Sequence, residues 1–151
     1  MANNYLEPKD NIDNWIVTAI SALRKGNLDD FQVHLTAFLS SIPYTMRRKD
    51  SEREKERYFH YTFYLLLRLL STYTVYTEKV QSLGRVDCIV ETSKFIYIFE
   101  FKLDGTAQEA LSQINNRGYA REYAYDKRKL FKIGCCFSSE TGTIEDWMIE
   151  G

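Results

Sequence analysis

The chain has 151 residues, of which 44% are hydrophobic, and a formal net charge of -1. This length is sufficient for one compact domain with a sizeable core, and its 2 Pro and 7 Gly residues form no linker that would divide it. Its apolar runs are far shorter than the roughly 18 residues of a membrane-spanning helix, and no signal-peptide pattern begins it, so we expect a cytoplasmic protein without a membrane partner.

The sequence lacks the residues or motifs that several classes of catalytic site require. The two histidines, His34 and His60, both fall in predicted helices, which argues against a His-rich zinc centre and a Ser-His-Asp arrangement. The phosphate-binding pattern G-x-x-x-x-G-K-[ST] does not occur, so the chain is not an ATPase by that route. The three cysteines lack C-x-x-C spacing and lie in apolar segments, which indicates small buried hydrophobic residues in a reducing compartment.

The first part of the chain is predicted to be a helical hairpin. Residues 1–10 are polar and are expected to form a flexible N-terminus. Apolar residues then recur at helical spacing in two segments of residues 11–45, which Gly26-Asn27 separates and Pro43 ends. The apolar stripe of this hairpin must pack against either the domain that follows or an upstream part of a longer protein.

Residues 51–150 are predicted to form an α/β core. Ser51 and Glu54 make the S-x-x-E signature of a helix N-terminus. Glu56 lies in the first turns of that helix and is either a charge that favours the helix dipole or a residue that contributes to a site. Residues 75–80 are predicted to form the first strand.

Two further strands carry charged residues where the sequence is otherwise apolar. Residues 86–90 form the first, with Asp87 near one end, and residues 95–102 form the second, with Glu100 and Lys102 near its end. Side chains two residues apart in a strand share a face, and a neighbouring strand can bring a third residue to that face. We therefore expect Asp87, Glu100 and Lys102 to gather there.

Burial of these charges requires compensation. The second strand is apolar or aromatic on both faces, as expected of a central strand. A desolvated carboxylate or ammonium is destabilising by several kcal/mol unless it is paired or bound to a metal. A divalent cation shared by Asp87 and Glu100, with Lys102 beside it, would supply the compensation. The alternative is an ion pair of Glu100 and Lys102 on a half-exposed strand, with Asp87 in a turn.

The remaining elements complete the predicted sheet. Residues 106–123 are predicted to form a helix, and Gln113 lies beside its apolar face as either a surface residue or a site residue. Residues 130–138 and 144–149 are predicted to form the last two strands. The order of these elements indicates an α/β fold with a mixed central β-sheet flanked by helices, in a single domain of residues 11–151.

A run of short motifs extends over about residues 15 to 149. In chain order these motifs are Gly26-Asn27, Ser41–Tyr44, Glu56–His60, Gly84-Arg85-x-Asp87, Phe99–Leu103, Ala110–Ile114, Tyr119-Ala120, Phe137 and Ile144–Trp147. Taken together, they resemble the PD-(D/E)XK nuclease superfamily, and within it the nuclease-like C-terminal domain of bacterial AAA-ATPase-like proteins. Val86 occupies the position of the proline that gives the superfamily its name, and this position varies within the superfamily.

The resemblance implies a restriction-endonuclease-like core and assigns roles to the matching positions. Asp87 and Glu100 would be ligands of Mg²⁺ or Mn²⁺, and Glu56 would join them from the first core helix. Lys102 would position or activate the attacking water. Gln113 would reach back to the site from its own helix.

Two functional classes are compatible with the sequence. The first is a metal-dependent nuclease that acts on DNA or RNA, with DNA favoured. The second is a catalytically silent nuclease-fold module that binds or regulates a partner such as an AAA-type ATPase domain or chain. The intact set Asp87, Glu100, Lys102 and Gln113 favours the first, because buried charges are expensive to keep. The near-neutral net charge favours the second, because duplex binding depends on Lys and Arg.

Overall fold

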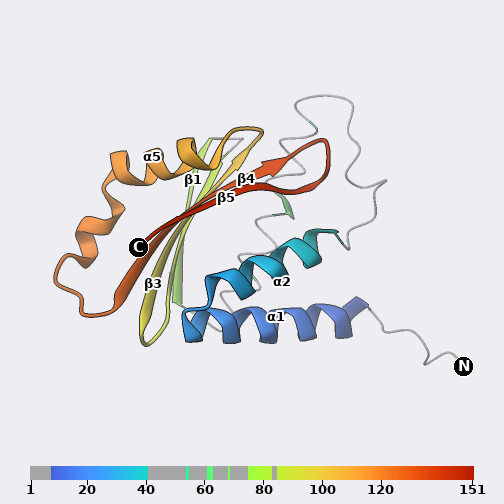
Figure 1. Cartoon of the computed structure of the whole chain (residues 1–151), viewed down its shortest axis with the longest axis horizontal. Helices are drawn as coiled ribbons and strands as arrows, with labels where there is room; N and C mark the ends of the chain where they lie inside the picture. The colour runs from blue at the N-terminus through green and yellow to red at the C-terminus, as the bar shows by residue number, and fades with distance from the viewer. Residues whose placement is uncertain (1–7, 41–53, 55–60, 63–67, 69–74, 83–84) are drawn as a thin grey trace, which may run out of the picture.

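The computed structural model describes residues 8–40, 54, 61–62, 68, 75–82 and 85–151 (Figure 1). Glu56 and most of the helix predicted to begin at Ser51 lie outside these residues. Within the described part, no helix is long and apolar enough to cross a bilayer. The elements follow in the order α1 (Pro8–Lys25), α2 (Leu28–Ser40), β1 (Val75–Ser82), β2 (Arg85–Glu91), β3 (Phe95–Leu103), α5 (Ala107–Arg117), η2 (Tyr119–Tyr123), β4 (Lys129–Ser138) and β5 (Thr143–Glu150).

The described strands form one five-stranded sheet in the order β1-β2-β3-β4-β5. β3 and β4 are parallel, whereas the other neighbouring strands are antiparallel. The segment with α5 and η2 connects the parallel pair, since parallel strands need a crossover connection. The predicted fold class is thereby confirmed: a restriction-endonuclease-like α/β core with a mixed central sheet, preceded by a helical pair.

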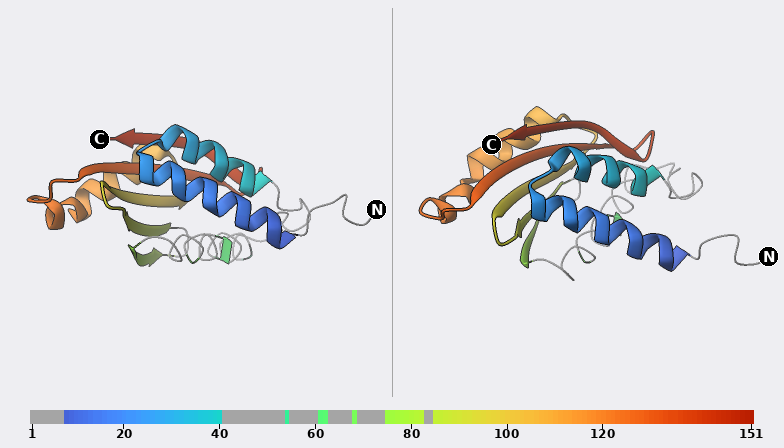
Figure 2. Two further views of the ribbon diagram at one scale, coloured as in Figure 1. Left: turned by 90° about the horizontal axis from the view of Figure 1, so that it is seen from below. Right: turned by 60° about the horizontal axis from the view of Figure 1, so that its bottom comes forward.

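Helices cover both faces of this sheet, with α1 and α2 on one face and α5 on the other (Figure 1, Figure 2). Tyr97, Phe99 and Phe101 of β3 belong to the core that includes α1 and α2. Ile96 and Ile98 belong to a second core with α5 and η2. Because side chains alternate along a strand, even-numbered positions of β3 face α5.

The helical hairpin packs directly on the aromatic face of β3. Phe31 of α2 lies against Phe99, with ring centroids 5.7 Å apart. The Tyr97 hydroxyl donates a hydrogen bond of 2.5 Å to the carbonyl of Leu23 in α1. The apolar stripe of the hairpin therefore covers the α/β core, which was the first of the two alternatives.

The turn between α1 and α2 is the predicted break at Gly26-Asn27. Gly26 has a φ of 75°, which favours glycine, and the Asn27 side chain accepts a hydrogen bond of 3.0 Å from the backbone N–H of Asp30. At the other end, α1 begins at Pro8, so the helix includes the last three residues of the segment 1–10.

The helix predicted over residues 106–123 is shorter in the structure. α5 ends at Arg117, because Gly118 adopts the left-handed conformation with a φ of 66° and its N–H bonds to the carbonyl of Asn115. Residues Tyr119–Tyr123 then form the separate 3-10 helix η2. The periodic apolar pattern continued across Gly118, but the glycine changes the direction of the chain.

α5 approaches the sheet most closely at Gly134 of β4. A Cβ atom at Gly134 would lie 2.4 Å from the Ala107 carbonyl oxygen and 2.9 Å from the Leu111 nitrogen. Both are backbone atoms of α5, which cannot rotate away as a flexible side chain does. Gly134 pairs in register with Glu100, so this close approach lies beside the charged part of β3.

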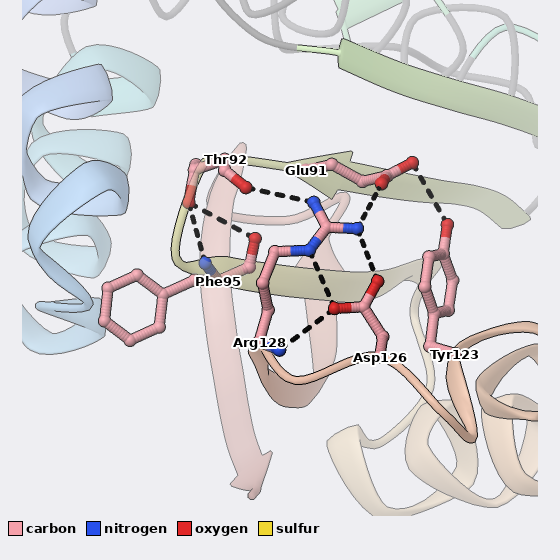
Figure 3. Close-up of polar contacts among 6 residues, drawn as sticks. All are labelled: Glu91, Thr92, Phe95, Tyr123, Asp126 and Arg128. Carbon is pink, nitrogen blue, oxygen red and sulfur yellow. Dashed lines mark hydrogen bonds and ion pairs between the residues drawn. The ribbon is translucent and has the colours of Figure 1, made fainter.

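A polar cluster fixes the opposite end of the β2–β3 hairpin (Figure 3). The Arg128 guanidinium donates to the Asp126 carboxylate at 2.7 and 3.0 Å, to Glu91 Oε1 at 2.8 Å and to the Thr92 carbonyl at 3.0 Å. The Tyr123 hydroxyl donates to Glu91 Oε2 at 3.2 Å. Hydrogen bonds from the Arg128 side chain and backbone lower the pKa of Asp126 to about 2.

We expect Gly134→Ala to lower the free energy of unfolding by about 1–3 kcal/mol, because the added methyl group overpacks the contact between α5 and β4. Urea unfolding measures the change. The control is Ser112→Ala, at an exposed position of α5. Its free energy of unfolding is expected to stay within about 0.5 kcal/mol of that of wild type. An unchanged stability of Gly134→Ala would show that α5 can move away from the sheet.

The Asp126–Arg128 pair should contribute to stability in a pH-dependent way. The pKa of Asp126 in the folded chain, about 2, lies below its usual value of 3.8. Its stabilisation is therefore present above about pH 4 and is lost as the pH falls from there through 2. In melting curves between pH 5 and 2, Asp126→Asn should lose less stability than wild type, and parallel curves would contradict the assignment.

Candidate active site

Asp87 and Glu100 lie directly opposite each other on neighbouring strands. The antiparallel register of β2 and β3 pairs Asp87 with Glu100, and two residues further on it pairs Ile89 with Ile98. Both isoleucines belong to the core under α5. Opposed residues of an antiparallel pair project on one face with their Cβ atoms roughly 4.5–5.5 Å apart. The structure thus brings the two carboxylates together on the α5 face.

Both carboxylate residues are almost completely buried. Asp87 is 2% exposed and Glu100 is 0% exposed. This excludes the alternative in which Asp87 served a turn, since Asp87 is inside β2. Like charges at opposed strand positions repel, and burial away from water makes the repulsion stronger. The arrangement therefore needs a compensating positive charge or donor.

The two oxygens of Asp87 have different surroundings. Oδ2 accepts a hydrogen bond of 2.7 Å from the Tyr119 hydroxyl. Oδ1 is buried and has no hydrogen-bond partner among the residues that the structure describes. A buried carboxylate oxygen without a donor is destabilising, so Oδ1 is the atom of Asp87 that can bind a further group.

Tyr119 is held as a neutral donor. Burial, followed by the hydrogen bond to Asp87 and the charge of Asp87, raises the pKa of Tyr119 to about 12. The charge of Arg117 and a side-chain hydrogen bond with it act in the opposite direction. Because this pKa lies far above neutrality, the hydroxyl keeps its proton and continues to donate to Asp87.

Lys102 follows Glu100 by two residues on β3, and its side chain lies at the N-terminus of α5. Its methylene groups cover Gly105, where an added Cβ would lie 2.2 Å from the Lys102 Cε atom. Its Nζ atom is 3.9 Å from Glu109 Oε2. The Lys102 side chain is 23% exposed, so its amine is partly accessible to solvent.

Gln113 is a half-buried residue of α5, next to the buried Ile114. It thus lies at the margin of the helix face that covers the sheet. Glu56 lies outside the described residues. The structure therefore brings together Asp87 and Glu100. It places Lys102 on the same strand as Glu100, and Gln113 on the helix that covers this face of the sheet.

The N-terminus of α5 is anchored from three sides. Thr106 caps the helix by accepting from the Glu109 N–H at 3.1 Å. Asp146 of β5 accepts from the Ala107 N–H at 2.9 Å, a position where negative charge also favours the helix dipole. Gly134 allows the close contact with β4. These contacts fix the helix that covers the carboxylates.

Sequence reasoning did not find the contact between Tyr119 and Asp87. Tyr119 belongs to one of the motifs that carry the resemblance, but the predicted helix over residues 106–123 includes it without a distinct role. Gly118 was the available signal, because a glycine near the end of a helix often terminates it. The partner of Tyr119 could not be predicted, since the two residues are 32 positions apart.

The donor set suits a hard divalent cation. The described residues contain no group of three or more His, Cys, Asp or Glu side chains that could hold a metal ion. Mg²⁺, however, usually keeps several waters and is bound through one or two carboxylates. The unsatisfied Oδ1 of Asp87, opposite Glu100, meets that requirement.

Comparison with known proteins identifies the family. The PD-(D/E)XK nuclease superfamily profile matches residues 54–147, which is more than half of the chain. The chain belongs to this superfamily. The matched segment of this PD-(D/E)XK protein includes Asp87, Glu100, Lys102 and Gln113, together with Glu56.

A curated relative of this PD-(D/E)XK chain is known from Azotobacter chroococcum mcd 1 under the name "Uncharacterized protein in vnfD 5'region". It is 31% identical over 130 residues, which are 85% of this chain and 25% of the relative. The chain thus spans about a quarter of that relative's length. No solved structure matches the chain significantly.

We expect Asp87→Asn to raise the free energy of unfolding by about 1 kcal/mol or more when chelator removes divalent metal. The amide loses the buried charge opposite Glu100 and can still accept from Tyr119. Urea unfolding at pH 7 measures the change.

The matched control is Asp126→Asn, which should lower stability because Asp126 accepts charge-assisted hydrogen bonds from Arg128. A loss of stability in Asp87→Asn as large as that in Asp126→Asn would show that the Asp87 charge is compensated without metal.

Proposed function

We propose that this chain is a divalent-metal-dependent nuclease that hydrolyses phosphodiester bonds of nucleic acid, with DNA favoured over RNA. The observation that carries the proposal is the buried pair Asp87 and Glu100, opposed on β2 and β3 inside the segment that matches the superfamily. Two costly buried carboxylates at the positions of the superfamily motif support a metal site more than they support a structural role.

Each site residue has a proposed part in the reaction. Asp87, through Oδ1, and Glu100 would hold Mg²⁺ or Mn²⁺, and Glu56 would join them from the first core helix. When bound, the ion would lower the pKa of its water and stabilise the charge that develops on the phosphodiester. The Gln113 amide would orient the water or the phosphate from α5.

Lys102 is the proposed electrostatic catalyst. Its ammonium would position the attacking water and stabilise negative charge in the transition state. The contact with Glu109 at 3.9 Å supports this assignment, because a long and partly exposed ion pair adds little stability and holds the amine only loosely. Lys102 can therefore turn from Glu109 toward a phosphate at the edge of the site.

A second candidate function is supported by the net charge of -1, which provides little general attraction for a nucleic-acid duplex. In this alternative the chain is a catalytically silent nuclease-fold module that binds or regulates a partner, such as an AAA-type ATPase domain or chain. The greater length of the Azotobacter relative, of which the matched region is a quarter, is consistent with additional domains there. We propose a cytoplasmic location for either function.

The decisive experiment is a cleavage assay with the purified chain. Single-stranded, duplex and branched DNA and RNA are incubated with the protein and Mg²⁺ or Mn²⁺, and at least one substrate should be cut. Lys102→Ala should reduce the rate about a hundredfold or more, because removal of one well-placed electrostatic group raises the barrier by about 3 kcal/mol. The folded state of each variant is checked by its melting curve.

Lys132→Ala provides a closely matched control. The Lys132 side chain is 22% exposed and its Nζ lies 3.4 Å from Glu150, so it resembles Lys102 in exposure and in having an acidic partner. Its Nζ also donates a hydrogen bond of 2.7 Å to Asn115 Oδ1, so the melting curve of this variant is compared as well. We expect this variant to keep the wild-type rate within about threefold, which corresponds to a change of less than about 0.7 kcal/mol in the barrier. Cleavage that persists in Lys102→Ala and Asp87→Asn would indicate a contaminating nuclease. No cleavage of any substrate would favour the silent module.

A further inference from the structure

Two tyrosines of η2 bind two carboxylates of β2. The Tyr119 hydroxyl donates to Asp87 Oδ2 at 2.7 Å, and the Tyr123 hydroxyl donates to Glu91 Oε2 at 3.2 Å. Asp87 and Glu91 are four residues apart on one strand, so they share a face. In the antiparallel pairing of β2 with β3, Asp87 lies opposite Glu100, whereas Glu91 lies opposite Ile96. The two hydrogen bonds are thus alike in chemistry, but only one of them lies at the carboxylate pair.

The position of Tyr119 is fixed by packing. Tyr119 is 9% exposed and belongs to the core with Leu111, Ile114 and Ile98. The left-handed conformation of Gly118 directly before it separates η2 from α5 and turns the chain toward the sheet. A buried ring has few alternative rotamers, so its hydroxyl is a well-defined donor for Asp87.

We propose that Tyr119 is a positioning residue, which holds Asp87 Oδ2 so that Oδ1 is directed to a divalent cation shared with Glu100. This inference rests on the proposed metal-dependent nuclease function. The contact is asymmetric, since Oδ2 has a donor and Oδ1 has none among the described residues. The proposed role therefore predicts a carboxylate that binds through one oxygen with a fixed orientation.

The physical reason is the freedom that a carboxylate otherwise has. An unrestrained aspartate can rotate and can bind a cation through one oxygen or two. A hydrogen bond to one oxygen removes most of these arrangements, so less conformational freedom is lost when the cation binds. Removal of such a partner of a metal ligand typically weakens metal binding about 10- to 100-fold.

The test compares Tyr119→Phe with Tyr123→Phe in the full chain. Calorimetric titration with Mn²⁺ is the main readout, and we expect Tyr119→Phe to weaken Mn²⁺ binding about 10- to 100-fold. Tyr123→Phe loses the same chemical group from the same helix and should stay within about twofold of wild type. In cleavage assays, Tyr119→Phe should raise the Mn²⁺ concentration that gives half the maximal rate by the same factor. Its rate at saturating Mn²⁺ should recover, whereas Lys102→Ala stays slow at every concentration.

The outcomes separate this inference from the proposed function. If wild type binds Mn²⁺ and Tyr119→Phe binds it equally well, the positioning role is wrong and the nuclease proposal stands. If wild type does not bind Mn²⁺, the metal chemistry is wrong and the positioning role is wrong with it. An equal loss in Tyr119→Phe and Tyr123→Phe would also overturn the role, because it would indicate a general effect of η2.

Tyr119→Phe can also fail to fold, because Asp87 then keeps a buried charge without its donor. In that case Asp87→Asn is added to the same chain. Recovery of folding beyond the stabilisation that Asp87→Asn gives alone would support the role, since the excess would show that the hydroxyl serves the Asp87 carboxylate. Failure to recover would overturn it, since it would show that the hydroxyl is needed elsewhere in the core.

Discussion

The alternation of side chains along β3 determines how the rest of the structure is arranged. This central strand is buried on both faces, so each of its residues must match one of two different surroundings. Tyr97, Phe99 and Phe101 make an aromatic surface for the helical hairpin. Glu100 and Lys102 are directed to the opposite face, which α5 covers. Among the described residues, the hairpin side of β3 thus packs in an aromatic and aliphatic core, while the carboxylates of Asp87 and Glu100 lie on the α5 side.

The carboxylate pair was predictable because its geometry follows from local rules. A strand period of two residues and a short connection are sufficient to place Asp87 and Glu100 on one face. The end of α5 at Arg117 and the contact of Tyr119 were not predictable in the same way. Hydrophobic periodicity continued through Gly118, and the position of η2 depends on contacts with β2 that are distant in sequence. Local patterns thus predicted the strands and the charges, but not the residue that completes their surroundings.

Several contacts converge on the start of α5, the helix that covers the carboxylate pair. Buried carboxylates oppose close packing, because their removal from water is unfavourable. Asp146, the Thr106 cap and the contact at Gly134 hold the helix over them. Asp104 adds to this by accepting two hydrogen bonds from Ser139, which tie the β3–α5 turn to the end of β4. A carboxylate pair that is unfavourable by itself is thereby kept buried by the contacts around it.

The parallel pairing of β3 with β4 has a consequence for the order of folding. The β2–β3 hairpin closes a short loop at Thr92, where the side chain accepts a hydrogen bond from the Phe95 N–H, and such hairpins form within microseconds. The pairing of β3 with β4 requires closure of the much longer segment that contains α5, which is slower. This difference in loop length predicts that Asp87 and Glu100 meet while water still surrounds them, and that they lose this water only when α5 docks on the sheet. The burial of this carboxylate pair is thus a property of the crossover connection and not of the hairpin that brings the two residues together.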